Sequence, residues 1–473
     1  MSFDVIAIGG GFAGLVVANR CAQFGLRAVV LEKDSADRYM CNSRITTGVC
    51  HILFQNMRLP AEKIQPIIER ETAGNAKPEL VKLYAANSRR AIDWLTAEGS
   101  RFMEMTTSTG PSLIMAQPRR FKEGVDWEGR GPDVMLRQLE ANLVKRGGQL
   151  LRGTKVEALV MQDGACVGVD AVQGGKPVRL EAKAVVIADG GFSANVDMIR
   201  RYITPQAERM VMRGTLSATG DGLRMAEAVG VQMGGFGQFY GHPVHREAYT
   251  KSNANLWPFP MLDPLIQVSI VVGADGKRFA DEGRNGIVLS NVMAQLADPL
   301  STTLIFDDKL WNSVGKESAS SPNPLLASAG GTLHKANDLK ALAGMAGLPA
   351  EALIATVAAY NQGLASGAAD KLDPPRTMVP IAARPIEQAP FYAMPLCSGI
   401  TATMGGILID TECRAHRADG SAIAGLYAAG STVAGIEGGP KVAYMGGLSK
   451  AFIFGLLAGE AIARAAGKTT PVQ

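Results

Sequence analysis

Cysteine is sparse and unpatterned in this sequence. Its six cysteines are scattered over 473 residues without a C-x-x-C pair. Disulfide frameworks, zinc sites and Fe–S clusters depend on cysteine spacing, and haem attachment on C-x-x-C-H, so none of these is expected. The thiols are instead typical of a reduced, cytoplasmic protein. They are Cys21, Cys41, Cys50, Cys166, Cys397 and Cys413.

Long apolar runs and strong charge are absent as well. No uncharged apolar stretch reaches the roughly 18 residues of a membrane span. The net charge is +4 and no Lys/Arg run stands out, so nucleic acid is not expected as a partner. The first expected strand begins too near the N-terminus for a signal peptide. At 47% apolar and 19% charged residues, the chain is expected to form a globular protein of two or more domains.

Residues 4–33 carry the clearest pattern in the chain. Residues 5–8 are apolar and rich in β-branched types, which suits a buried parallel strand. Residues 15–22 are typical of a helix, and residues 28–31 of a second strand. The stretch therefore predicts a strand–helix–strand unit.

Glycines at G-x-G-x-x-G spacing lie between the first strand and the helix. Gly9 permits a tight turn, Gly11 leaves room for a pyrophosphate at the helix N-terminus, and Gly14 lets the helix pack on the strand. Glu32 follows Gly14 by 18 residues, where an acid accepts hydrogen bonds from ribose hydroxyls. Glycines alone are weak evidence, but the complete unit predicts a dinucleotide site.

Further glycine turns and acids punctuate the chain. A strand at residues 184–188 ends in Asp189, Gly190 and Gly191, and residues 219–222 (TGDG) precede a helix at 223–230. Both patterns suit a bound nucleotide. Other expected elements are helices at 78–99, 132–147, 195–202, 349–364 and 448–465, a strand at 150–160, and hairpin turns at 163–164 and 174–175.

The alternation of strands and helices breaks in the middle of the chain. Residues 231–345 are expected to form an inserted α+β capping domain for the substrate. Residues 1–230 and 346–473 are expected to form one discontinuous Rossmann-like domain around a central parallel sheet. The fold class expected is therefore α/β.

The order and spacing of seven motifs resemble the flavoprotein family of fumarate reductases, tricarballylate dehydrogenases and 3-ketosteroid Δ1-dehydrogenases. The resemblance implies FAD in an extended conformation and hydride exchange between flavin N5 and a carbon near an activating carbonyl. Covalent members carry a histidine beside the position of Asn42 and Ser43; its absence here implies noncovalent FAD. The motifs are GGGFAG at 9–14, NSR at 42–44, VVIADGGFSAN at 185–195, TGDG at 219–222, DGKRFADE at 275–282, TMGG at 403–406 and GLYAAG at 425–430.

The resemblance also implies a set of cofactor-binding residues. Gly447 and Leu448, at a helix start after Gly446, would aim N–H groups at the flavin pyrimidine edge and stabilise the anionic reduced flavin. The full set is Gly9, Gly11, Phe12, Ala13, Gly14, Glu32, Lys33, Asn42, Ser43, Arg44, Thr47, Gly48, Val156, Asp189, Gly190, Gly191, Asn195, Asp221, Gly430, Ser431, Gly447 and Leu448.

Three residues are candidates for the substrate chemistry. Arg284 lies near the family's arginine proton donor, but an arginine needs a carboxylate relay such as Asp281 or Glu282; it can equally be a surface arginine in a salt bridge. His242 resembles the histidine of the family's HPT segment, which binds a substrate carboxylate; it can also cap a turn. Tyr444 matches the tyrosine of the dehydrogenases, which donates to a substrate carbonyl.

Two departures argue against a dicarboxylate substrate. Ala402 stands where fumarate reductases carry a second carboxylate-binding histidine, and Tyr444 where they carry an arginine. A dicarboxylate would then leave charges poorly paired in a closed site. Lys441 either replaces one contact or is solvated. The family's glutamate after GLYAAG is Ser431 here, and Glu437 lies nearby.

The first hypothesis is an FAD-dependent dehydrogenase that desaturates the Cα–Cβ bond beside a ketone or carboxylate of a small substrate, cyclic ones included, and passes electrons to a separate acceptor. The alternatives are a fumarate-type reductase working in the opposite direction, an electron-transfer flavoprotein subunit, and a nucleotide-binding protein without a redox role. No second G-x-G-x-x-G unit occurs, which argues against NAD(P)H as a direct partner. No metal is expected.

Overall fold

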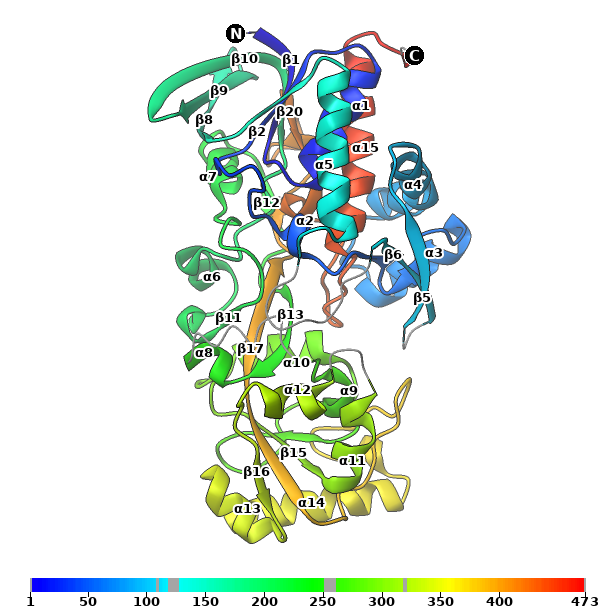
Figure 1. Ribbon diagram of the computed structural model, residues 1–473, viewed down its shortest axis with the longest axis vertical. Coiled ribbons are helices and arrows are strands. Elements are labelled where there is room, and N and C mark those ends of the chain that lie inside the picture. Colours follow the sequence, from blue (N-terminus) through cyan, green and yellow to red (C-terminus); the bar gives the residue numbers. More distant parts are fainter. Residues whose placement is uncertain (1, 108–109, 118–126, 251–260, 318–320, 472–473) are drawn as a thin grey trace.

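The protein is an elongated α/β molecule with both termini at one end (Figure 1). Its computed structural model describes residues 2–107, 110–117, 127–250, 261–317 and 321–471. The α/β fold class expected from the sequence is confirmed. No helix of the described ranges combines the length and the apolarity needed to cross a bilayer.

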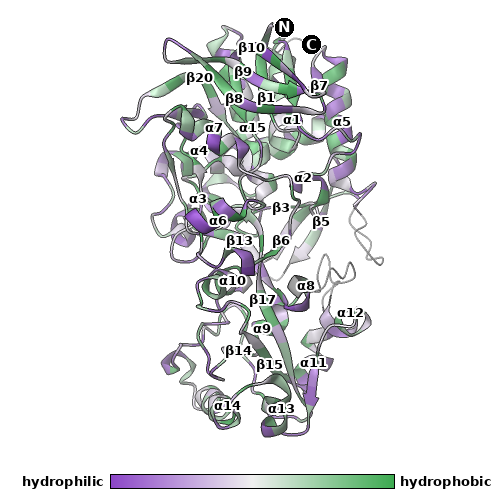
Figure 2. Cartoon of the chain, turned by 90° about the vertical axis from the view of Figure 1, so that its left-hand side faces the viewer, coloured by the Kyte–Doolittle hydropathy of each residue, from purple (hydrophilic) through white to green (hydrophobic). Residues whose placement is uncertain are grey.

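The first sheet joins strands from both ends of the chain. Its parallel strands run in the order β20, β10, β1, β2, β7. Helices α1, α5 and α15 cover one face (Figure 1), and the strands themselves are largely hydrophobic (Figure 2). The elements are β1 (Ser2–Ile8), α1 (Phe12–Gln23), β2 (Ala28–Leu31), α5 (Gly131–Lys145), β7 (Gln149–Leu151), β8 (Thr154–Gln162), β9 (Ala165–Gln173), β10 (Lys176–Ile187), β19 (Arg414–His416), β20 (Ala422–Ala428) and α15 (Gly447–Ala465).

The register of this sheet gathers three loops at one edge. Ile8 of β1 pairs with Ile187 of β10, and Ile187 pairs with Ala428 of β20. Because parallel strands end on the same side, the segments starting at Gly9, at Asp189 and after Ala428 lie together. A ligand of an open α/β sheet binds outside these carboxyl ends.

Smaller elements surround that edge of the first sheet. A sheet in the order β4, β3, β6, β5 lies beside the packed helices α3 and α4. They are α2 (Asn42–Ile45), β3 (Val49–Ile52), β4 (Gln55–Asn56), α3 (Ala61–Thr72), α4 (Pro78–Ala97), β5 (Phe102–Thr107), β6 (Gly110–Met115), α6 (Val196–Tyr202), α7 (Asp221–Ala228), β12 (Met233–Gly234) and β18 (Gly406–Ile407).

The second sheet is built on β17, the long strand that runs between the two halves (Figure 1). Strands β11, β13, β15 and β16 pair with β17, and β14 pairs with β15. The elements are β11 (Val211–Met212), β13 (Phe239–His245), α8 (Glu247–Thr250), α9 (Asp263–Ile266), β14 (Ile270–Val272), α10 (Gly286–Ala294), β15 (Thr303–Asp307), α11 (Asp308–Asn312), α12 (Pro322–Ser328), β16 (His334–Ala336), α13 (Leu339–Ala346), α14 (Ala350–Ala365) and β17 (Phe391–Thr403).

Each half has its own hydrophobic core. The first is formed around β1, α1, β10 and α15. The second surrounds β14, β15 and β17, and it includes Leu353, Val357 and Tyr360 of α14. A division of the chain at residues 230/231 and 345/346 stays a prediction.

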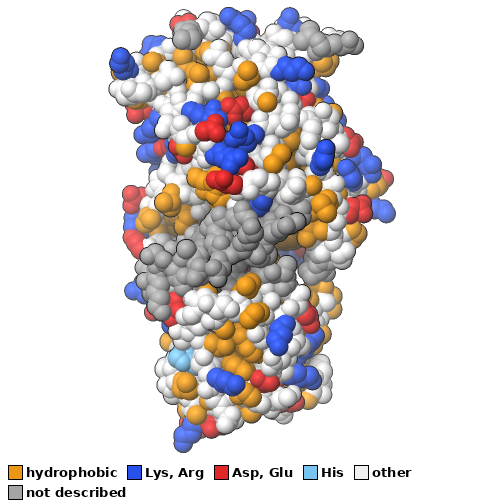
Figure 3. Space-filling view, viewed as in Figure 1, with side chains coloured by type: hydrophobic (Ala, Val, Ile, Leu, Met, Phe, Trp, Pro, Cys, Tyr) orange, Lys and Arg blue, Asp and Glu red, His pale blue; other side chains and the backbone are white. Residues whose placement is uncertain are grey.

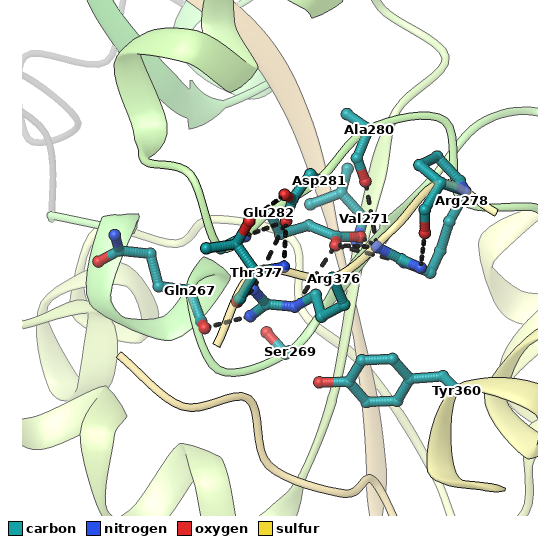
Figure 4. A network of polar contacts seen from close by, with 12 residues as sticks. Gln267, Ser269, Val271, Arg278, Ala280, Asp281, Glu282, Tyr360, Arg376 and Thr377 are labelled. Carbon is teal, nitrogen blue, oxygen red and sulfur yellow. Dashed lines mark hydrogen bonds and ion pairs between the residues drawn. The ribbon is translucent and has the colours of Figure 1, made fainter. Parts of the chain in front are cut away.

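A buried ionic cluster ties two segments of the second core together (Figure 4). Glu282 accepts hydrogen bonds from Arg278 (2.7 Å, Nη2 to Oε2) and from the N–H of Val271 (3.0 Å), and it lies 3.7 Å from Arg376 Nε. Asp281, next to it, accepts from the N–H of Thr377 at 2.9 Å. Residues 278–282 are thereby joined to residues 376–377.

The long helices follow the sequence closely, while one expected strand differs. Helices α4, α5, α14 and α15 lie within two residues of their predicted bounds, and both predicted hairpin turns connect β8, β9 and β10. The strand-like stretch at 150–160 forms two strands instead of one. The chain turns at Gly153, whose φ is +62°, and so separates β7 from β8.

Acidic and basic side chains are interspersed on the face shown in Figure 3. Exposed ion pairs such as Arg201–Glu227 (2.8 Å) and Arg179–Asp170 (2.7 Å) neutralise each other locally. This is the arrangement of an ordinary solvated surface.

Candidate active site

A cavity of about 1900 Å³ lies between the edge of the first sheet and the second core. The three predicted substrate residues, His242, Arg284 and Tyr444, all line it. So do most of the predicted cofactor residues: Gly9, Gly11, Ala13, Glu32, Lys33, Asn42, Ser43, Thr47, Val156, Asp189, Gly190, Asp221, Gly430, Ser431, Gly447 and Leu448.

The remaining predicted cofactor residues lie behind this wall. The N–H of Phe12 donates to Ser43 Oγ at 3.1 Å, and Arg44 forms a fully buried ion pair with Asp133. Asn195 caps α6 by accepting from the N–H of Met198 at 3.1 Å. Gly14, Gly48 and Gly191 are likewise buried. Direct contact of these six residues with a cofactor stays a prediction.

The glycine turn is held by the acid that ends β2. Glu32 Oε2 accepts from the N–H of Gly10 at 2.9 Å, and Oε1 accepts from the N–H of Asp34 at 2.9 Å. The hydroxyl of Tyr39 donates to the carbonyl of Gly10 at 2.6 Å. Burial raises the pKa of Glu32. A carboxylate oxygen has more than one acceptor site, so Glu32 can fix the turn and still accept from a ligand hydroxyl.

The turn itself leaves no room for side chains. A Cβ at Gly9, where φ is +106°, would lie 2.8 Å from the carbonyl oxygen of Ala188, and one at Gly14 would lie 2.1 Å from that of Gly9. A Cβ at Gly11 would lie 3.1 Å from Ser43 Oγ. The backbone at the start of α1 is therefore open to the cavity, as a pyrophosphate site requires.

A second acidic group follows β10. Asp189 Oδ2 accepts from the N–H of Gly222 at 2.7 Å, whereas Oδ1 is buried without a hydrogen-bond partner among the described residues. Burial raises the pKa of Asp189 to about 6. Nearby, Lys33 Nζ donates to Asp221 at 2.9 Å and to Thr219 at 2.7 Å.

Tyr444 lines the cavity against the N-terminus of α15. Its hydroxyl accepts a hydrogen bond from the N–H of Gly447 at 2.6 Å, which leaves its own proton free to be donated. The ring of Tyr240 stacks on it at 3.8 Å between centroids and 8° between planes. Burial raises the pKa of Tyr444 well above its ordinary value. The group is thus a fixed, neutral donor.

His242 forms a pair with Asp263 beside the two tyrosines. Nδ1 of His242 lies 2.8 Å from Asp263 Oδ1, and its ring meets that of Tyr240 edge-on at 5.2 Å. Arg213, which donates to Thr401 Oγ1 at 3.1 Å, also lines this part of the cavity.

Arg284 is tied to the loop that carries Tyr444. Its Nη2 donates to the carbonyl of Pro440 at 2.7 Å. The carboxylates considered as its relay are bound elsewhere: Glu282 to Arg278 (2.7 Å) and Asp281 to Thr377 (2.9 Å). This geometry favours a positioning role for Arg284 over proton transfer.

Two open questions from the sequence concern Lys441 and Glu437. Lys441 lines the cavity and lies 3.3 Å from Glu71 of α3. Glu437 is buried and pairs with Lys450 at 2.5 Å. Glu437 therefore supports the first turn of α15.

Comparison with known proteins identifies the family. Residues 4–442 match the model of the FAD binding domain family. The chain belongs to this FAD-binding family. Its curated relatives include an NADH:fumarate oxidoreductase from Klebsiella pneumoniae, 28% identical over 98% of this chain and 48% of the relative, and a 4-oxocyclohexanecarboxylate 2-dehydrogenase from Sinomonas cyclohexanicum, 27% identical over 98% and 94%.

The first of these relatives is much longer than this chain, which spans about half of its length. Among solved structures, the 3-ketosteroid Δ1-dehydrogenase from Sterolibacterium denitrificans aligns with a TM-score of 0.78 at 20% identity, over 98% of this chain and 100% of that one. This likeness confirms the fold.

The residues of the cavity fit FAD. The open backbone of the glycine turn suits the pyrophosphate, and the Glu32 carboxylate suits a ribose hydroxyl. The buried Oδ1 of Asp189 can accept a hydrogen bond from a ligand. The glycine turn and the start of α15 line the same cavity, so the N-termini of both helices would face a bound cofactor.

Sequence reasoning missed Arg213, Tyr240, Asp263 and His51 in this cavity. His51 follows the NSR motif closely and is one of only five histidines, which was a usable signal. The other three come from separate elements of the second core. Tyr240 is placed by the pairing of β13 with β17, Arg213 follows β11, which also pairs with β17, and Asp263 lies on α9.

His51 predicts an acid-dependent loss of stability. Its Nδ1 accepts from the N–H of Phe54 at 3.0 Å, and burial lowers its pKa from 6.5 to about 4. Below pH 6.5 His51 binds a proton in the unfolded chain but stays neutral in the folded chain until the pH approaches 4. The free energy of unfolding therefore falls as the pH drops. Between pH 7 and pH 5 this effect lowers the free energy of unfolding by about 2 kcal/mol.

Urea unfolding at those two pH values checks this prediction. His51→Gln is expected to lose about 2 kcal/mol less than the wild type between pH 7 and pH 5. Equal losses in both proteins would show that His51 does not control this step.

Proposed function

We propose that the protein is an FAD-dependent dehydrogenase that desaturates the Cα–Cβ bond next to a ketone or carboxylate of a small substrate, cyclic ones included. The observation that carries the proposal is Tyr444. Its hydroxyl accepts from the first N–H of α15 at 2.6 Å and lines the same cavity as the glycine turn.

The residues of the cavity divide the work of such a reaction. Bound FAD supplies the hydride acceptor. Tyr444, whose hydroxyl is fixed by the N–H of Gly447, holds the substrate carbonyl oxygen and stabilises the negative charge that develops there. Arg284 keeps the loop of Tyr444 in place through Pro440. Thr377, Val379 and Ile381 line the same cavity, where apolar side chains would help to exclude water from the bound substrate.

Relatives with related chemistry support the proposal. One is named for the dehydrogenation of a cyclic oxo acid, and the chain covers nearly all of it. A separate electron acceptor, the three-part division of the chain and the individual cofactor contacts belong to the same proposal.

The second candidate is reduction of an activated C=C bond in the manner of a fumarate reductase. It is favoured by curated relatives named fumarate reductase, which are 28% identical over 98% of the chain. Ala402 and Tyr444 at the positions of two dicarboxylate contacts weigh against it.

An anaerobic absorbance assay decides between the two. Oxidised protein is mixed with cyclohexanones, 4-oxocyclohexanecarboxylate and tricarballylate, and dithionite-reduced protein with fumarate and with enones. Bleaching of the flavin by a saturated ketone is expected. Reoxidation by fumarate alone, without bleaching by any saturated compound, would favour the reductase.

A further inference from the structure

We propose that His242 is the base that removes the proton next to the substrate carbonyl, and that Asp263 is its positioning residue. This inference rests on the proposed dehydrogenase function and names the proton-transfer group for it. It replaces the carboxylate-binding role that the family resemblance implied for His242.

The dyad is built from two elements of the second core. His242 lies on β13, where it pairs with Gly399 of β17, and Asp263 is the first residue of α9. Both side chains keep 18% exposure and line the cavity. Gly286, at the start of α10, makes room for the acid, since a Cβ there would lie 1.7 Å from Asp263 Oδ1.

The contact between the two groups fixes the imidazole for base chemistry. A carboxylate can only accept, so the 2.8 Å contact places a proton on Nδ1 of His242. In the neutral ring the lone pair is then on Nε2, at the far side of the ring from Asp263. The same logic governs the histidine of a Ser-His-Asp triad.

The charges around the dyad keep Asp263 ionised. Burial acts to raise the pKa of Asp263, but the His242 ring and the Arg213 guanidinium outweigh it and hold the pKa below its ordinary value. Arg213, which lines the same part of the cavity, thus helps to keep the carboxylate an acceptor for Nδ1 of His242.

The other candidates are less suited to take a proton. The hydroxyl of Tyr444 already accepts from Gly447 at 2.6 Å and is set to donate. A guanidinium group has no acceptor atom, and that of Arg284 is bound to the carbonyl of Pro440. Burial raises the pKa of Tyr240, which disfavours its basic form.

The proton-transfer step is redox-neutral. The C–H bond next to the carbonyl breaks, its proton goes to Nε2 of His242, and its electron pair forms the enolate, whose oxygen is held by Tyr444. In the reverse direction the imidazolium returns a proton, or a deuteron taken from solvent, to the same carbon. The step therefore needs no oxidant.

Hydrogen–deuterium exchange isolates this step from desaturation. FAD-loaded protein is reduced with dithionite, so that no hydride can leave, and mixed with 4-oxocyclohexanecarboxylate or cyclohexanone in D2O. Exchange next to the carbonyl is followed by NMR. Wild-type protein is expected to exchange, and His242→Gln to be slower by about 10²–10⁴-fold.

Matched variants separate the base from the scaffold. His245→Gln alters a buried histidine of the same strand, whose Nε2 contacts the carbonyl of Thr332 at 2.9 Å, and is expected to exchange normally. Asp263→Asn should lower kcat strongly with little change in KM, and Asp263→Glu should recover part of it. In His242→Ala, added imidazoles should restore exchange in the order of their basicity.

The outcomes distinguish the dyad from the proposed function. Normal exchange in His242→Gln, or loss of exchange in Tyr240→Phe alone, would overturn the dyad while leaving the dehydrogenase intact. Rescue that ignores the basicity of the imidazole would also overturn it. Wild-type protein that neither exchanges nor desaturates any probe would overturn both.

Discussion

Tyr444→Phe is expected to lower kcat/KM for desaturation by about 10²–10³-fold while FAD stays bound. The hydroxyl is the one group that this change removes. It accepts from Gly447 at 2.6 Å, and the stack with Tyr240 at 3.8 Å keeps the ring in place. Because burial keeps the pKa of Tyr444 well above its ordinary value, the lost group is a neutral donor at working pH.

Steady-state kinetics and flavin absorbance together test this expectation. Tyr84→Phe is the matched control. It removes a buried hydroxyl of α4 that contacts Ser449 of α15 at 2.9 Å, and Tyr84 does not line the cavity. Its kcat/KM should stay near that of the wild type. A loss below about tenfold in Tyr444→Phe would mean that α15 alone stabilises the enolate.

The FAD-binding half could be predicted because its signals are local. The turn at Gly9–Gly14, the acid at Glu32 and the helix start at Gly447 are each fixed by residues close in sequence, and the three strand ends follow from parallel pairing. The long helices carry enough periodic residues for their bounds to be predicted as well.

The substrate half could not be predicted because its contacts are non-local. Tyr240 and Tyr444 stack although they belong to distant segments, and Asp263 of α9 meets His242 of β13 across 21 residues of sequence. Proximity in sequence suggested Asp281 and Glu282 as proton relays for Arg284. In the structure Glu282 binds Arg278 and Asp281 binds Thr377 instead. Side-chain direction after a bend is set by tertiary packing, which no local pattern encodes.

The ionic cluster in the second core predicts the largest loss of stability. Glu282→Gln is expected to lower the free energy of unfolding by about 3–5 kcal/mol, since it leaves buried guanidinium groups without their main counter-ion. The side chains of Glu282 and Arg376 are fully buried, and that of Arg278 is 4% exposed. Urea unfolding followed by circular dichroism measures the change.

Two controls separate charge burial from packing in this cluster. Glu227→Gln makes the same change in an exposed pair with Arg201 and should leave the unfolding midpoint unchanged. Adding Arg278→Met to Glu282→Leu should recover part of the loss, because it removes one unpaired charge together with its partner. An unchanged midpoint in Glu282→Gln would contradict the prediction. Since Arg284 and Thr377 flank the cluster and line the cavity, loss of the cluster should also raise KM before the FAD-binding half unfolds.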